Sequence, residues 1–347
     1  MAKVLSGGDF FALDIGTNAL RVAQLKPSIS GQSWDLVGSG HVPMDDRIIK
    51  TDTVEGKKKL GDLILTVVGQ SGIKTKDIVI GFPSSKTFTT VIDLPEMPEN
   101  ELRNTIKYQI DQYIPMSVSE TKFDYAILGK SIKDPQEVEV LISSVANSYT
   151  EDKIDFIESL GFNVLSAEPE GIAMLRSILP AGIQDARLVI DFGEQNTDIA
   201  VTYGDTPRLI RNIPIGIRTF IKASVQNLNV QEDQARQFIL KFGFAKDKLD
   251  GHVFQAVLSN LDNFVAELKK SIQFFQNRYP NIKVNGIILS GYAPVIPMFA
   301  QYITEKTSIT CSVANPFQNV NVPVDAQAKL AAVASEFAAV IGLAKRI

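Results

Sequence analysis

The feature of this sequence that most limits its fold is a weak internal repeat of a strand–turn–strand pattern. Residues 10–25 (FFALDIGTNALRVAQL) resemble residues 187–202 (RLVIDFGEQNTDIAVT). In this alignment Asp14 coincides with Asp191, and a glycine follows each of them two residues later. One such hairpin would be ordinary turn chemistry, since Asp and Gly are common turn residues. Two related copies about half a chain apart predict a duplicated fold whose hairpins face each other across a cleft.

Segments with strand and helix patterns alternate along the rest of the chain. Short apolar runs, such as 78–82 and 284–290, are typical of buried strands. Residues 57–71 and 253–279 instead have the apolar stripe of amphipathic helices. Because strands and helices alternate throughout, the sequence predicts an α/β protein.

Changes in this pattern divide the chain into three predicted regions. The first lobe comprises residues 1–76 and 169–186. The strands and helices between them, residues 77–168, form an inserted α+β subdomain that we expect to bind a partner. The second lobe comprises residues 187–347 and includes a helical part at about 222–282.

The composition excludes several kinds of site. The chain has 35 Lys and Arg against 39 Asp and Glu, a formal net charge of −4, so it is a poor candidate for nucleic-acid binding. The single cysteine, Cys311, excludes an intrachain disulfide and a thiolate-rich zinc site. Only two histidines, His41 and His252, are present, which nearly excludes a histidine metal cluster. We expect Cys311 to be a small buried residue.

No segment has the length and composition of a membrane anchor. Gly7, Gly8 and Asp9 interrupt the N-terminal region where a signal sequence would need an apolar run. The longest apolar segment, 330–344, is shorter than the ~18 residues of a membrane-spanning helix and contains Glu336. We therefore expect a cytoplasmic protein without direct membrane insertion.

The two hairpins contain the residue types that a phosphate tail requires. Glycine lets the backbone approach phosphate oxygens, and successive N–H groups of a turn can bind an anion. Asp14 and Asp191 could hold Mg²⁺ through its water molecules. The other common phosphate motifs, GxxxxGK[ST] and a strand-borne GxGxxG, do not occur. We therefore predict that the hairpins bind the phosphates of a nucleotide together with Mg²⁺.

In these motifs and their order the chain resembles the actin-like ATPase superfamily, which includes actin, sugar kinases and the division protein FtsA. LDIGTNALRVAQL and VIDFGEQNTDIAV resemble its two phosphate motifs, and IILSGYAPVIPMFAQYI resembles its adenosine motif. YQIDQYIPMSVSETKFDY, NLNVQEDQARQFILKFG and ELKKSIQFFQ resemble segments of the PilM family of type IV pilus assembly proteins. The resemblance implies a duplicated ribonuclease-H-like fold with an inserted small α+β subdomain and with ATP and Mg²⁺ bound between two lobes.

The resemblance also implies roles for individual residues. Asp14 and Asp191 would hold the metal. The other positions of the two loops would contact the phosphates: Gly16, Thr17, Asn18, Arg21, Gly193, Asn196 and Thr197. Asp198 adds a carboxylate beside the second loop, where its charge would weaken phosphate binding. Glu168 matches an acidic position near the metal and the attacking water, which makes it the candidate catalytic residue; an exposed turn carboxylate is the alternative.

Two further groups of residues concern the nucleoside. Glu267 and Lys270, one helical turn apart, match positions that contact the nucleoside in relatives; the alternative is a solvated ion pair on one helix face. In the adenosine motif Gly291 is followed by Tyr292, and Met298 follows a proline, where the superfamily usually has glycines. The Tyr292 ring could block the purine pocket, turn outward or stack on the adenine.

The resemblance implies an adaptor of the type IV pilus inner-membrane platform with weak or no ATPase activity. Its partners would be other platform proteins and the cytoplasmic N-terminal tail of a PilN-like membrane protein, bound between the insertion and the first lobe. Residues 113–115 could line that groove, but the sequence favours a helix end with core contacts for them. That partner would hold the protein at the inner membrane. The alternatives are an FtsA-like filament-forming ATPase, an active ATPase or phosphotransferase, and a domain of the type II secretion platform. The chain ends at Ile347 without the amphipathic helix of FtsA, which favours the pilus hypothesis.

Overall fold

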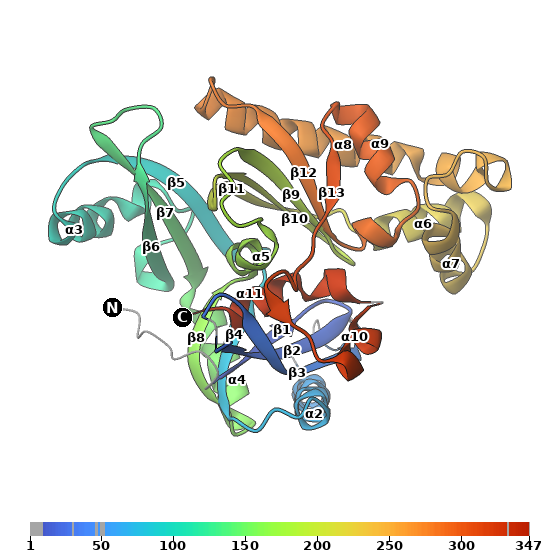
Figure 1. Ribbon diagram of the computed structural model, residues 1–347, viewed down its shortest axis with the longest axis horizontal. Coiled ribbons are helices and arrows are strands. Elements are labelled where there is room, and N and C mark those ends of the chain that lie inside the picture. Colours follow the sequence, from blue (N-terminus) through green and yellow to red (C-terminus); the bar gives the residue numbers. More distant parts are fainter. Residues whose placement is uncertain (1–9, 30, 46–47, 49–52, 332, 347) are drawn as a thin grey trace. The chain divides into compact units, whose positions relative to one another are not determined.

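The chain forms two compact units in the computed structural model, which describes residues 10–346 apart from 30, 46–47, 49–52 and 332 (Figure 1). The first unit comprises Met1–Ser177, Phe317–Leu330 and Ala339–Ile347. The second comprises Ile178–Pro316 and Ala331–Ala338. Residues 1–9, with which the predicted first lobe begins, lie outside the described residues.

A six-stranded sheet with the order β14-β3-β2-β1-β4-β8 forms the centre of the first unit. The strands β3, β2 and β1 are antiparallel neighbours, whereas β4 and β8 continue parallel to β1. The strands are β1 (Phe11–Ile15), β2 (Ala19–Pro27), β3 (Trp34–Pro43), β4 (Asp77–Phe82), β8 (Asn163–Pro169) and β14 (Val320–Asn321). The helices of this unit that belong with the sheet are α2 (Val54–Gln70), α4 (Asn147–Ser159), α5 (Glu170–Ile178), α10 (Val324–Leu330) and α11 (Ala338–Ala344).

The helix α2 illustrates how the sequence forms these elements. Its N-terminus is capped by Thr53, whose hydroxyl accepts a hydrogen bond from the Gly56 N–H at 3.1 Å. The buried residues Leu60, Ile64 and Val67 follow at helical spacing and contribute to the core beside the sheet.

The inserted subdomain is a separate three-stranded sheet with the order β5-β7-β6 and antiparallel pairing (Figure 1). It consists of β5 (Thr87–Pro95), β6 (Thr121–Lys130), β7 (Glu137–Ala146) and the helix α3 (Glu99–Gln109). Ile106 of α3 packs with Ile92 and Val140 of the sheet in a small core of its own. Ile114, at the end of the helical segment, is buried in the same core.

The second unit contains a five-stranded sheet with the order β11-β10-β9-β12-β13. Its three antiparallel strands followed by parallel strands repeat the order β3-β2-β1-β4-β8 of the first unit, which confirms the predicted duplication. The strands are β9 (Ala186–Phe192), β10 (Thr197–Tyr203), β11 (Thr206–Ile213), β12 (Val284–Gly291) and β13 (Cys311–Val313). The helices are α6 (Ile217–Leu228), α7 (Glu232–Phe242), α8 (His252–Arg278) and α9 (Phe299–Thr307).

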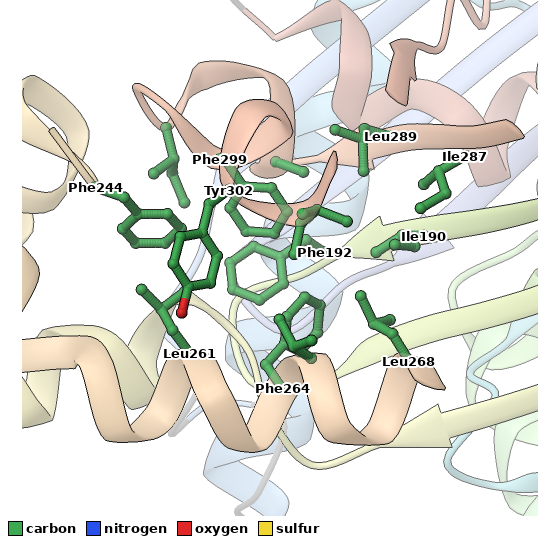
Figure 2. Close-up of a cluster of buried hydrophobic side chains, with 14 of the residues drawn as sticks. Ile190, Phe192, Phe244, Leu261, Phe264, Leu268, Ile287, Leu289, Phe299 and Tyr302 are labelled. Atoms are coloured by element: carbon green, nitrogen blue, oxygen red, sulfur yellow. The ribbon is translucent and has the colours of Figure 1, made fainter. Parts of the chain in front are cut away.

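Aromatic side chains fill the core of the second unit. The Phe192 ring lies 5.5 Å from Phe220, 5.3 Å from Phe264 and 5.0 Å from Phe299, measured between ring centroids. Figure 2 shows Phe192 between Phe264 of α8 and Phe299 of α9. The turn of the second hairpin therefore begins directly after a residue that lies among three other phenylalanine rings.

The predicted domain boundaries differ from the structure at two places. The predicted insertion includes β4, α4 and β8. In the structure β4 and β8 join the main sheet of the first unit, and Ile157 of α4 packs in the core of that unit. The separate sheet therefore begins only at β5 and ends with β7. The predicted second lobe runs to residue 347, whereas residues 317–330 and 339–347 belong to the first unit. They join it because β14 pairs with β3 and α11 packs against α5.

Among the described residues, no single helix is both long and apolar enough to cross a membrane. One pair of shorter helical segments, Val324–Leu330 with Ala334–Ala344, passes the same test only when taken together across a bend of 100°.

Candidate functional site

β1 and β2 form the first hairpin, joined by residues 16–18, which we call the first loop. Asp14 lies directly opposite Arg21, and the Arg21 guanidinium donates to the Asp14 carboxylate at 3.2 Å. Both side chains are buried. A Cβ on Gly16 would lie 2.7 Å from the Arg21 guanidinium, so glycine leaves room for the arginine. The predicted residues of the first loop therefore lie together, with Arg21 against the turn.

The second hairpin, formed by β9 and β10, carries two carboxylates at the corresponding positions. Asp191 lies directly opposite Asp198, where the first hairpin has Asp14 opposite Arg21. The Asn212 amide of β11 donates to Asp198 at 2.6 Å. Like charges that face each other across a strand pair repel. The two hairpins thus have the same strand pairing but differ in charge. The first pairs its aspartate with an arginine, whereas the second pairs its aspartate with another aspartate.

The turn of the second hairpin, residues 193–196, is held against the start of α6, and we call it the second loop. The Gly193 carbonyl accepts the Ile217 N–H at 3.0 Å, and the Glu194 carbonyl accepts the Arg218 N–H at 2.9 Å. The Gly193 N–H donates to the Asn196 carbonyl at 3.0 Å. These bonds fix the loop backbone before any ligand is present.

Thr197 and Asn196, both predicted to contact phosphate, have different surroundings. Thr197 is fully buried, and its hydroxyl donates to the Ile215 carbonyl at 2.6 Å. Asn196 is partly exposed in the loop. The Thr197 hydroxyl therefore stabilises the hairpin, and phosphate binding by either residue stays a prediction.

The predicted adenosine turn, residues 291–292, lies beside the second hairpin in the same unit. The Tyr292 N–H donates to the Phe192 carbonyl at 2.8 Å. Gly291 has a φ of +65°, and a Cβ there would lie 2.5 Å from the Phe192 oxygen, so this position requires glycine. Met298, where the superfamily usually has glycine, also has a positive φ of 64°, a conformation that costs a non-glycine residue about 1–2 kcal/mol.

Arg236 bonds the Tyr292 side chain and also Glu194, and neither Arg236 nor Glu194 was predicted from the sequence. Arg236 of α7 donates to both oxygens of the Glu194 carboxylate, one of them at 3.1 Å. Burial opposes the charge of Arg236, but its hydrogen bonds to Glu194 and then to Tyr292 raise its pKa above the usual value. The Tyr292 ring is partly buried against the core of the second unit. No local pattern in the sequence links residues 42 positions apart, which is why this cluster was missed.

Glu267 and Lys270, predicted to contact the nucleoside, form an ion pair with each other on α8. The Lys270 amine donates to Glu267 at 2.6 Å, and the Arg211 guanidinium of β11 donates to the other Glu267 oxygen at 3.2 Å. The hydrogen bond from Lys270, followed by the bond from Arg211, keeps the pKa of Glu267 below its usual value. These contacts fit the alternative of an ion pair on the helix face, and nucleoside binding stays a prediction.

Glu168, the predicted catalytic residue, is held by two arginines in the first unit. Arg176 of α5 donates to its two oxygens at 2.8 and 3.0 Å, and Arg346 donates to one of them at 2.9 Å. The Glu168 side chain is only 8% exposed, so it is not the exposed turn carboxylate of the alternative. Because both oxygens already accept hydrogen bonds from cations, the geometry favours a structural role, and the orientation of a water molecule stays a prediction.

Replacing Glu168 with glutamine should therefore lower stability. The Glu168→Gln variant leaves two guanidinium groups without their carboxylate, and we expect a loss of about 2 kcal/mol in the free energy of unfolding, measured by urea denaturation. The exposed Glu158 of α4 provides a matched control, and Glu158→Gln should change stability little. Unchanged stability of Glu168→Gln together with lost ATP hydrolysis would favour the catalytic role instead.

Lys345, next to this cluster, gives a pH-dependent prediction. Its amine donates to the Gln318 carbonyl at 3.1 Å, and burial, together with repulsion from Arg176, lowers its pKa from 10.5 to about 8. Between pH 8 and 10.5 the unfolded chain binds more protons at this lysine than the folded protein does, so stability rises with pH across this window. Below pH 8 the amine is charged in both states, and the folded state bears the whole unfavourable free energy of burying that charge.

The variant Lys345→Met removes this titration. Below pH 8 we expect its free energy of unfolding to exceed that of the natural protein by about 1 kcal/mol. This difference should become smaller as the pH rises towards 10. Thermal unfolding at several pH values measures the difference. Lys58→Met, which removes an exposed lysine of α2, is the matched control. A stability difference for Lys345→Met that does not change with pH would contradict the lowered pKa of Lys345.

The described residues contain no group of three or more His, Cys, Asp and Glu side chains arranged to hold a metal ion. Cys311, predicted to be a small buried residue, is partly buried on β13, and burial raises the pKa of its thiol. A thiol with a raised pKa is a poor nucleophile.

Comparisons with known proteins identify both a family and a fold. The family model described as "Type IV pilus assembly protein PilM" matches residues 12–347. A solved "PilM-PilN type IV pilus biogenesis complex" contains a chain that is 19% identical, with a TM-score of 0.82 and 99% of each chain covered. The ethanolamine utilization protein EutJ from Carboxydothermus hydrogenoformans is 13% identical, with a TM-score of 0.56, covering 97% of this chain and 89% of that one.

A structure solved with a bound nucleotide analogue gives a further likeness. MreB 5 of Spiroplasma citri, solved bound to AMPPNP, is 13% identical with a TM-score of 0.53, covering 96% of this chain and 94% of that one. These structural likenesses confirm the predicted α/β fold of the actin-like ATPases.

Proposed function

Since this chain belongs to the PilM family of type IV pilus assembly proteins, we propose that it is a cytoplasmic actin-like adaptor that binds MgATP and the N-terminal tail of a PilN-like membrane protein. The family match over residues 12–347 carries this proposal. The similar solved complex pairs PilM with PilN, and the MreB structure contains a nucleotide analogue. The partner would keep the protein at the inner membrane and near the other platform proteins.

The residues of the second hairpin fit a hydrated divalent cation. Mg²⁺ prefers oxygen ligands and retains much of its water, and the facing carboxylates of Asp191 and Asp198 supply oxygen ligands on one face of the sheet. When bound, Mg²⁺ would neutralise part of the phosphate charge. Asp14 fits this role less well, because Arg21 already bonds its carboxylate.

The residues of the first hairpin fit the phosphates themselves. The Arg21 guanidinium lies against the glycine turn; one of its nitrogens bonds Asp14, and a guanidinium has further N–H donors that form strong hydrogen bonds to phosphate. Residues 16–18 provide the small side chains and backbone beside it. We therefore assign phosphate binding to the first loop with Arg21 and metal binding chiefly to Asp191.

Calorimetric titration with ATP and Mg²⁺ tests the nucleotide part of the proposal. We expect the natural protein to bind MgATP with micromolar affinity. The affinity of Asp191→Asn should be at least about tenfold lower, because the variant loses a charged ligand of the metal. Asp205→Asn, at an exposed aspartate after β10, should bind as the natural protein does. Equal binding by the two variants would remove Asp191 from the metal site.

The partner part is tested by fluorescence polarisation with a labelled peptide of the cytoplasmic N-terminal tail of a PilN-like protein, with and without MgATP. Binding of the peptide supports the adaptor role, and no binding in either condition overturns it. The filament-forming alternative instead predicts polymers that sediment in MgATP. The enzyme alternative predicts continuous ATP turnover, which the contacts of Glu168 do not favour.

A further inference from the structure

Three side chains of the second unit connect the second loop to the adenosine turn. Glu194 lies within the loop, Tyr292 in the turn and Arg236 on α7. Arg236 donates to both Glu194 oxygens and also hydrogen-bonds to the Tyr292 side chain. One guanidinium therefore joins two segments that lie almost 100 residues apart in the sequence.

The backbone of the two segments is already in contact. The Phe192 residue precedes the second loop, and its carbonyl accepts the Tyr292 N–H at 2.8 Å. Arg236 adds a side-chain connection on top of this backbone bond. A shift of the Glu194 side chain would thus be transmitted to Tyr292 through Arg236.

Charge explains why the connection matters for an anionic ligand. The Glu194 side chain is only 6% exposed, so its carboxylate depends on Arg236 for compensation of its charge. An uncompensated carboxylate in this loop would repel phosphate oxygens. Burial by itself would disfavour the charged form of Arg236. Its interactions with Glu194 and Tyr292 outweigh burial and raise its pKa above the usual value.

We propose that Arg236 is a positioning residue for nucleotide binding: it neutralises Glu194 in the second loop and, through Tyr292, holds the adenosine turn in register with that loop. This inference rests on the proposed function, since it concerns the same nucleotide site. Arg236 needs no contact with the nucleotide for this role. Two ligands separate its two effects: inorganic tripolyphosphate with Mg²⁺ reports on the phosphate and metal part of the site without the adenosine turn, whereas ATP reports on that part and the turn together.

Calorimetric titrations of the full chain with Mg²⁺ and each ligand test the proposal. In Arg236→Gln we expect the affinities for ATP and for tripolyphosphate to fall about tenfold or more, because Glu194 is left uncompensated. In Tyr292→Phe only the hydroxyl is lost, so ATP affinity should fall about threefold to tenfold while tripolyphosphate affinity stays unchanged. The double variant Glu194→Gln/Arg236→Gln should recover tripolyphosphate binding, because the buried charge is gone.

The controls separate this role from a general loss of structure. Lys241→Gln removes a positive charge from an exposed position on the same helix and should bind both ligands as the natural protein does. Near-natural affinities for both ligands in Arg236→Gln, or equal losses for both in Tyr292→Phe, would overturn the inference. If the natural protein binds ATP and tripolyphosphate but the double variant recovers neither, the neutralising role is wrong. If the natural protein binds neither ligand, the proposed nucleotide function fails first and this inference fails with it.

Discussion

Replacing Gly342 with alanine should strongly destabilise the first unit. A Cβ on Gly342 of α11 would lie 1.7 Å from the Ala173 carbonyl oxygen of α5 and 2.4 Å from its carbonyl carbon. Both are backbone atoms, so neither can move away as a flexible side chain would. Ala173 is fully buried, and α11 would have to leave α5 to make room.

The expected loss exceeds about 3 kcal/mol, which is a large part of the 5–15 kcal/mol that stabilises a typical domain. The same helix–helix contact includes the bond from Arg176 to the Gly342 carbonyl at 2.6 Å, so displacement of α11 would also disturb the arginines around Glu168. Urea denaturation followed by circular dichroism measures the loss.

The matched control is Gly69 in α2. A Cβ there meets no atom within 4 Å, so Gly69→Ala should stabilise the protein by about 0.5–1 kcal/mol through the lower entropy of the unfolded chain. Similar unfolding midpoints for Gly342→Ala and Gly69→Ala would contradict the close contact between α5 and α11.

The local parts of this fold could be predicted from the sequence. The two Asp-x-Gly hairpins are recognisable because apolar strands flank a polar turn, and their duplication follows from the alignment of Asp14 with Asp191. The structure confirms antiparallel hairpins at both places. α3 ends at Gln109 and a 3₁₀ turn, Ile110–Gln112, follows it, before Pro115 prevents a helix from continuing.

The parts that depend on distant residues could not be predicted. A strand pattern shows that β4 and β8 are strands but not which sheet they join, and they pair with β1 and with each other rather than with the insertion. Glu168 was chosen because it matches an acidic position of the resembling superfamily, and no local pattern shows that Arg346 bonds it from 178 residues away. The bond between Arg236 and Glu194 also joins residues far apart in sequence, 42 positions from each other. The charge difference between the hairpins is readable from Arg21 and Asp198 only after the strand register is known.

In the second unit, we expect the largest loss of stability when Phe192 is replaced. Its ring is fully buried and lies within 5.5 Å of three other phenylalanine rings, so Phe192→Ala would open a cavity among side chains that have nowhere to relax (Figure 2). Such substitutions cost about 3–5 kcal/mol, whereas Phe192→Leu, which keeps most of the volume, should cost about 1.5 kcal/mol.

The position of Phe192 links this stability effect to the site. Asp191 and Gly193 flank it, and its carbonyl accepts the Tyr292 N–H, so a cavity beneath it would loosen the second loop and the adenosine turn together. We expect Phe192→Leu, which should remain folded, to bind MgATP more weakly than the natural protein. Phe274→Ala on α8 is the matched control, because that ring is 59% exposed and its removal should alter neither unfolding nor binding. Equal stability of Phe192→Ala and Phe274→Ala would show that the aromatic cluster does not support the second hairpin.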